Sequence, residues 1–196
     1  MYIGPVTDHC EVDENGKLLP PCVRFENFWQ SLKVYTFELD ADNEITKEYF
    51  IRRRKNFSDS KGHRRVFPKK VLEQRNAKVE FSYFDGIRYN YINARKKIYC
   101  PMYAEMVQKT RYFKSLKERM ENGENLLIIG FDGFSFDPKT DDVYQHLNDP
   151  TKPFGHEAVI CCLLHGITPW DSTSSSSSSS SSISSSSPSH SESLSL

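Results

Sequence analysis

Several features of common protein classes are missing from this 196-residue sequence. No apolar stretch approaches the roughly 18 residues that a transmembrane helix needs, and the first residues lack the basic start and apolar run of a signal peptide. Cysteine occurs 5 times, an odd number, with no Cys-x-x-Cys pair, which indicates a reducing, cytoplasmic location rather than a disulfide framework. The 6 histidines are scattered and none is spaced like a ligand pair, so no metal site is predicted.

Charge is unevenly distributed along a chain whose formal net charge is zero. Residues 1–46 carry 3 Lys and Arg against 9 Asp and Glu, whereas residues 47–97 carry 16 against 5. Residues 98–170 return to 7 against 10. The basic middle block suits a partner that bears phosphate, either a nucleotide or a nucleic acid. Solvated helix faces would explain the same block equally well.

The pattern of segments predicts one domain over residues 1–170 and a disordered serine-rich tail over residues 171–196, because the tail has too little apolar surface to fold. Strands and helices alternate unevenly, which favours a single compact α+β domain, mainly helical with a few short strands. The sequence predicts a hairpin over 12–19, strands over 34–39, 78–84 and 126–129, and helices over 25–33, 46–56, 90–108 (kinked near Pro101), 110–120 and 155–164.

One constellation of residues has spacing that suggests chemistry. Glu26, Gln30 and Lys33 are separated by four and three residues, so on a helix they form one polar stripe beside an aromatic face. A carboxylate, an amide and an ammonium held together suit a ligand with ribose or phosphate groups, and the carboxylate can act as a base or stabilise a developing cation. A surface Glu–Lys pair of little energetic value is the alternative interpretation.

The opening motif resembles that of the NADAR (YbiA-like) superfamily of N-glycosidases. Residues 16–20, Gly-Lys-Leu-Leu-Pro, are similar to the family's hairpin, and the helix that follows matches its Glu-x-aromatic-aromatic-Gln-x-x-Lys pattern at Glu26, Phe28, Trp29, Gln30 and Lys33. Segments between residues 91 and 164 resemble the family's later helices more loosely, so the chain resembles a divergent member. The insertion pattern and serine homopolymer also resemble proteins of large DNA viruses or phages, which would place the protein in a host cell.

The resemblance implies an N-glycosidase that hydrolyses the ribose–nitrogen bond of a phosphoribosylated or ADP-ribosylated base without a cofactor. Its partner would be a small molecule of that kind or a modified nucleic acid. Glu26 would be the catalytic carboxylate, which stabilises an oxocarbenium-like centre or activates water. Asp132 would be a second carboxylate, although a turn-forming Asp-Gly explains it equally well. Residues implied to bind substrate are Trp29, Gln30, Lys33, Tyr91 and Arg95.

Tyr91 and Arg95 stand where the family has an Asp-Trp pair and a lysine. Tyrosine can stack on a base, and arginine can bind phosphate. The departure is compatible with a changed substrate or with lost catalysis. The alternative function is therefore a non-catalytic nucleotide or nucleic-acid binding module that uses the basic region 47–97, especially residues 52–55 and 61–70. A pocket around Glu26 lined by Lys33 and Arg95 favours the enzyme, and a flat basic surface remote from Glu26 favours binding alone.

Overall fold

The computed structural model describes residues 15, 17, 22, 24–130 and 135–171 of the chain. The described residues form an α+β fold that is mainly helical and contains a small antiparallel sheet, as the sequence predicts. Most of the predicted hairpin over residues 12–19, the predicted second carboxylate Asp132, and the serine tail lie outside the described residues.

The first half of the chain combines short helices with the sheet. Its elements are α1 (Phe25–Ser31), β1 (Lys33–Tyr35), a 3₁₀ turn (Thr36–Glu38), α2 (Lys47–Ser58), α3 (Lys69–Gln74), β2 (Val79–Phe84) and β3 (Ile87–Tyr89). The strands pair antiparallel in the order β1-β2-β3. Asp85 and Gly86 connect β2 to β3 with φ angles of 50° and 74°, the left-handed conformations that a tight hairpin requires and that the Asp-Gly pair predicts.

The second half is helical. It contains α4 (Tyr91–Ala94), a π-helical turn η2 (Arg95–Tyr99), α5 (Cys100–Gln108), α6 (Arg111–Glu121), α7 (Val143–Asn148) and α8 (His156–Leu164). The Asn90 side chain accepts a hydrogen bond from the Asn93 N–H and so caps α4, and Thr110 caps α6 in the same way. Gly123 has a φ of 85° just after α6, at the stop that the sequence predicts.

The helix predicted over residues 90–108 is present, but its irregularity lies before Pro101. Pro101 occupies the first turn of α5, and the π-helical turn η2 directly precedes it. Proline has no N–H to donate to the preceding turn, so the hydrogen-bonding pattern changes there. Tyr99, the last residue of this turn, is buried and its ring packs against Phe25 of α1.

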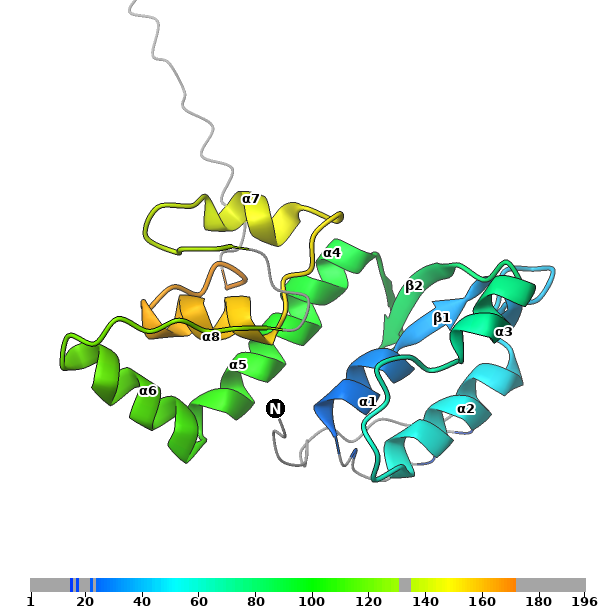
Figure 1. Cartoon of the computed structure of the whole chain (residues 1–196). Coiled ribbons are helices and arrows are strands. Elements are labelled where there is room, and N and C mark those ends of the chain that lie inside the picture. Colours follow the sequence, from blue (N-terminus) through cyan, green and yellow to red (C-terminus); the bar gives the residue numbers. More distant parts are fainter. Residues whose placement is uncertain (1–14, 16, 18–21, 23, 131–134, 172–196) are drawn as a thin grey trace, which may run out of the picture.

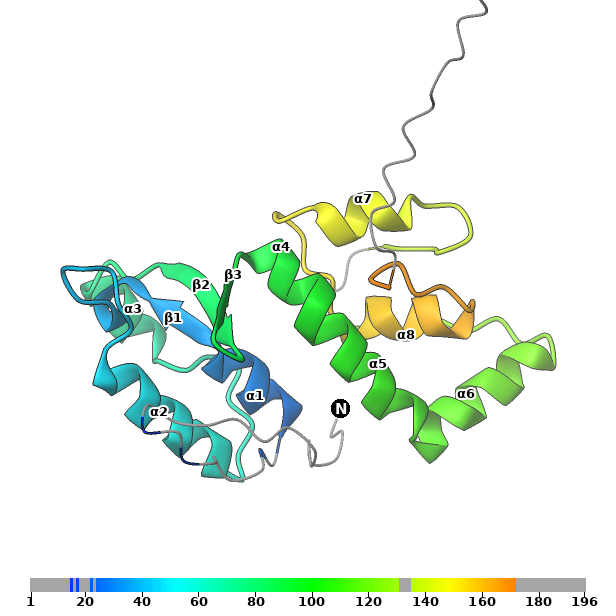
Figure 2. The ribbon, with the colours of Figure 1, turned by 180° about the vertical axis from the view of Figure 1, so that it is seen from behind.

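The two halves share one hydrophobic core. Figures 1 and 2 show the rod formed by α4, η2 and α5 between α1 and the sheet on one side and α6, α7 and α8 on the other. The centroid of the Phe25 ring lies 5.3 Å from that of Tyr99 and 5.6 Å from that of Tyr103. The ring centroids of Trp29 and Tyr99 are 4.9 Å apart. The buried cluster extends from Cys22 to Trp170. The aromatic side chains of α1 therefore help to join the halves, together with the contacts of α4 with β2 and β3.

The prediction of a buried strand over residues 126–129 is wrong. This segment is extended but forms no strand, and the side chains of Leu127 and Ile129 are 85% and 84% exposed. Leu126 and Ile128 pack partly against the core, so only alternate side chains face inward. A run of four apolar residues does not by itself distinguish a buried strand from a half-buried extended segment.

Candidate active site

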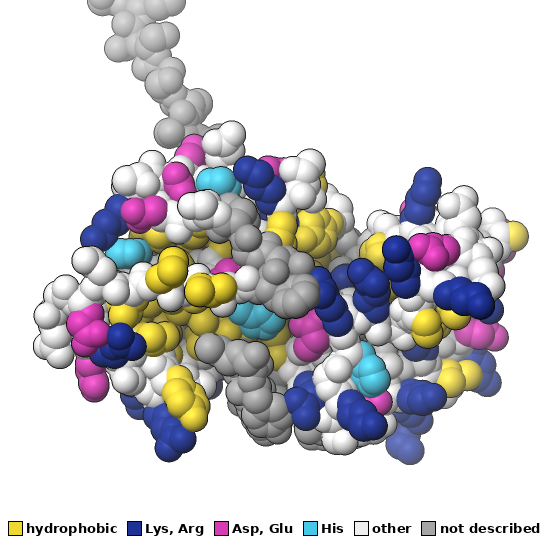
Figure 3. Space-filling model, in the orientation of Figure 1, with side chains coloured by type: hydrophobic (Ala, Val, Ile, Leu, Met, Phe, Trp, Pro, Cys, Tyr) yellow, Lys and Arg dark blue, Asp and Glu magenta, His cyan; other side chains and the backbone are white. Residues whose placement is uncertain are grey.

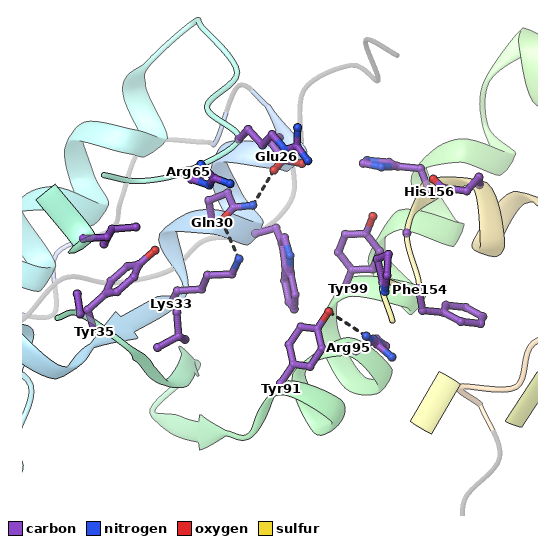
Figure 4. Close-up of a pocket in the computed structure, with 18 residues that line it drawn as sticks. Glu26, Gln30, Lys33, Tyr35, Arg65, Tyr91, Arg95, Tyr99, Phe154 and His156 are labelled. Atoms are coloured by element: carbon purple, nitrogen blue, oxygen red, sulfur yellow. Dashed lines mark hydrogen bonds between the residues drawn. The ribbon is translucent and has the colours of Figure 1, made fainter. Parts of the chain in front are cut away.

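A cavity of about 670 Å³ opens between α1 and the rod that follows β3. Figure 4 shows its walls, with Gln30 and Lys33 near the middle, Tyr35 on one side, and Tyr99, Phe154 and His156 on the other. Its lining includes six of the seven predicted site residues, namely Glu26, Trp29, Gln30, Lys33, Tyr91 and Arg95. The structure thus brings together residues that are up to 69 positions apart, from Glu26 to Arg95.

The polar stripe on α1 is a hydrogen-bonded row. Gln30 Nε2 donates to Glu26 Oε1 at 2.7 Å, and Lys33 Nζ donates to Gln30 Oε1 at 2.8 Å (Figure 4). Gln30 thereby uses both ends of its amide, which fixes the carboxylate and the ammonium relative to one another. The Gln30 amide therefore lies between the Glu26 carboxylate and the Lys33 ammonium and links them.

Lys33 occupies an unusual electrostatic position. Burial lowers the pKa of its ammonium group, Glu26 opposes this shift, and the nearby Arg65 adds to it. Its Nζ also lies 5.9 Å from the centre of the Trp29 ring, within reach of a cation–π interaction. A partly desolvated cation beside a second cation makes this part of the cavity favourable for an anion.

Arg95 has a different role from the phosphate binding expected of it. Its side chain is 1% exposed, and its guanidinium donates to the backbone oxygens of Leu147, Asp149 and Lys152 at 3.0, 3.0 and 2.7 Å. Arg95 Nη2 also donates to Tyr91 Oη at 2.8 Å. These contacts hold the end of α7 and the following loop, and they fix Tyr91 at the cavity. Arg95 therefore positions a wall of the site.

Two arginines that are not among the predicted site residues also line the cavity. Arg64 and Arg65 belong to the loop between α2 and α3, which the sequence identifies only as a basic segment. Asn27, 1% exposed on α1, holds this loop by donating to the Asp59 and Lys61 backbone oxygens and accepting from the His63 N–H. In the sequence, the one sign of this contact is an asparagine among the aromatic residues of the helix. That sign does not reveal which loop Asn27 binds.

The opposite wall carries a histidine and a second carboxylate, both at the start of α8. His156 and Glu157 line the cavity with Phe154, and the His156 ring packs edge-to-face on Tyr103, with centroids 4.5 Å apart. Burial lowers the pKa of His156, while Glu26 opposes the shift. The pKa of the Tyr99 hydroxyl, on the same side of the cavity as His156, is raised by burial. Neither His156 nor Glu157 was predicted, because only the fold brings residue 156 to residue 26.

Part of the basic block points into the protein rather than toward a surface. Arg52 forms a buried pair with Glu38, and Arg53 is 2% exposed between Tyr49 and Phe57, with burial lowering its pKa to about 10. Other Lys and Arg side chains do gather over the half that contains α2, α3 and the sheet, on the face drawn in Figure 3. The block is thus divided between structural cations, cavity cations and solvated ones.

The described residues also bear on cofactor and membrane binding. In the described ranges, no group of three or more His, Cys, Asp and Glu side chains is arranged to hold a metal ion. No helix among these residues is long and apolar enough to cross a membrane. Cys22, Cys100, Cys161 and Cys162 are free thiols.

Comparison with family models, with curated proteins and with solved structures gives no match.

Proposed function

We propose that the chain is an N-glycosidase that hydrolyses the ribose–nitrogen bond of a phosphoribosylated or ADP-ribosylated base, in line with the NADAR-like opening motif. The observation that carries the proposal is one cavity in which a carboxylate, Glu26, lies among aromatic rings and cations. Hydrolysis of such a bond passes through an oxocarbenium-like centre, which a fixed carboxylate stabilises. Cations at the same cavity bind the phosphate groups that such a substrate carries.

Each wall has a distinct part in this mechanism. Gln30 holds Glu26 Oε1 at 2.7 Å, so the carboxylate does not need to reorganise when positive charge develops at the ribose carbon. Lys33 and Arg65 lie together at the anion-binding side, where they attract phosphate. Trp29 and Tyr91 provide aromatic surface for the base or for the ribose.

The alternative, a non-catalytic module that binds nucleotide or nucleic acid through residues 47–97, is less well supported. Arg52 and Arg53 are occupied within the fold, and Arg64 and Arg65 face the same cavity as Glu26. A basic surface used only for binding phosphate gains nothing from a carboxylate at its centre, because like charges repel. The exposed lysines over α2 and α3 remain available for a weaker, salt-dependent contact.

The test is hydrolysis of an ADP-ribosylated guanine substrate, with release of ADP-ribose followed by chromatography. Wild type should release ADP-ribose, and Glu26→Gln should lower kcat by at least about 100-fold, because it removes the charge but keeps the size of the side chain. Glu80→Gln, at an exposed position of β2 outside the cavity, is the matched control and should retain activity. Circular dichroism checks that all three proteins are folded. An active Glu26→Gln variant would exclude Glu26 as the catalytic carboxylate.

A further inference from the structure

His156 lines the cavity and can accept or donate a proton, but the mechanism above leaves it unused. It is the first residue of α8, and it faces a site whose carboxylate comes from α1, some 130 residues earlier in the chain. Figure 4 shows its ring on the side of the cavity that holds Tyr99 and Phe154, turned toward Glu26. The electrostatic effect of Glu26 on His156 agrees with this placement.

Two phenol rings pack against the ring of His156. Tyr103 packs against it edge-to-face with centroids 4.5 Å apart, and Tyr99 does the same at 5.8 Å. Among the described residues, Glu26 from α1 acts on the imidazole electrostatically and these two phenols from the rod pack against it, while Glu157, its neighbour on α8, lines the same cavity. Because the phenols are buried groups with raised pKa values, they stay neutral, and Glu26 is the described carboxylate that acts on His156.

We propose that His156 is the general base that activates the attacking water, so that Glu26 is left to stabilise the charge on the sugar. The inference rests on the proposed function. In the step, an imidazole nitrogen accepts a proton from water while the water oxygen forms a bond to the anomeric carbon. The carbon–nitrogen bond breaks, its electron pair passes to the nitrogen of the base, and the imidazolium returns its proton to that nitrogen or to solvent. The products are the free base and the sugar hemiacetal.

The chemistry of both residues agrees with this division of roles. A neutral imidazole can accept a proton at neutral pH, and burial favours the neutral form of His156. Glu26 carries a charge that a developing cation needs, and its Oε1 already accepts a hydrogen bond from Gln30. A carboxylate that must stabilise a cation works best if it keeps its charge throughout, which it does when another group takes the proton.

The experiment measures kcat/KM for the full chain against pH, with the ADP-ribosylated guanine substrate. Wild type should lose activity toward acid with a midpoint below 6.5, the ordinary pKa of histidine, because burial lowers that of His156. His156→Gln should lower kcat/KM by about 100-fold or more and remove this acid limb. His156→Ala should regain activity when imidazole is added, which a purely structural role would not produce. His165→Gln, just after α8 and outside the cavity, should behave as wild type.

His156→Phe keeps a ring against Tyr103 but has no nitrogen, so it should be folded and as inactive as the glutamine variant. An active wild type whose rate and acid limb both survive in His156→Gln would overturn this inference alone and leave Glu26 as the base. A wild type that releases no ADP-ribose would overturn the proposed function, and the inference with it. The two failures are therefore distinguishable.

Discussion

A buried ion pair between Glu38 and Arg52 holds strand β1, which contributes lining residues to the cavity. Arg52 Nε lies 2.5 Å from Glu38 Oε1 and its Nη2 lies 2.9 Å from Oε2, and the two side chains are 10% and 2% exposed. Arg52 also donates to the backbone oxygen of Lys33 at 2.8 Å, while Glu38 accepts the Tyr35 N–H at 3.0 Å. The pair therefore attaches α2 to both ends of β1, at the point where Lys33 enters the cavity.

Removing one charge of this pair should destabilise the folded protein. We expect Glu38→Gln to lower the free energy of unfolding by about 3–5 kcal/mol, because the buried Arg52 then lacks its counter-ion. The assay is urea denaturation followed by circular dichroism, with comparison of the m-values to check that unfolding stays two-state. Arg52→Lys should also destabilise the protein, since a lysine keeps the charge but cannot bind both carboxylate oxygens in the same fork.

An exposed ion pair provides the control for this prediction. Lys109 Nζ lies 2.7 Å from Glu105 Oε1. Glu105 is on α5 and Lys109 directly follows this helix, and the two side chains are 64% and 67% exposed. Glu105→Gln should change the free energy of unfolding by no more than about 1 kcal/mol, because solvent screens this pair. A similar loss for Glu38→Gln and Glu105→Gln would refute the reasoning, since burial would then have no influence on the outcome.

Two further predictions concern the walls of the cavity. Arg95→Met should lower the free energy of unfolding by about 2–4 kcal/mol, since the carbonyls at the end of α7 lose their donor, and an unchanged melting temperature in calorimetry would contradict this role. Arg65→Ala should raise the pKa of Lys33 by removing a nearby positive charge, whereas Glu26→Gln should lower it. Side-chain NMR of Lys33 across a pH series measures both shifts, and shifts in the same direction would exclude this electrostatic arrangement.

The longer helices were predictable from local features of the sequence. Apolar periodicity predicts α1, Thr110 and Gly123 mark the ends of α6, and the helices predicted over 46–56 and 155–164 correspond to α2 and α8. The short helices α3 and α7 were missed, because six-residue helices are stabilised by tertiary contacts rather than by their own sequence. The prediction of a strand over residues 126–129 was wrong for a related reason. A strand needs a neighbouring strand to pair with, and the local sequence pattern does not show whether one is present.

The candidate site was predictable only where its residues are close in the sequence. Spacing along one helix places Glu26, Gln30 and Lys33 together, and the structure has them in one hydrogen-bonded row. The contributions of residues 59–65 and 153–157 depend on long-range contacts, which no period in the sequence encodes. Arg95 shows the same limit in another form, because residue type alone does not distinguish a cation that binds ligand from one that holds backbone carbonyls.

The position of Glu26 bears directly on the choice between hydrolysis and binding alone. A carboxylate in a cavity that also contains Lys33, Arg64 and Arg65 repels any phosphate that enters, so it weakens the binding of a ground-state anion. The same charge becomes favourable to the substrate when positive charge develops at the sugar in the transition state, and an interaction made in the transition state but not in the ground state raises the rate. Glu26→Gln should therefore bind ADP-ribose more tightly than wild type while it hydrolyses substrate more slowly. Tighter binding with no hydrolysis by either protein would instead identify a binding module in which the carboxylate limits affinity.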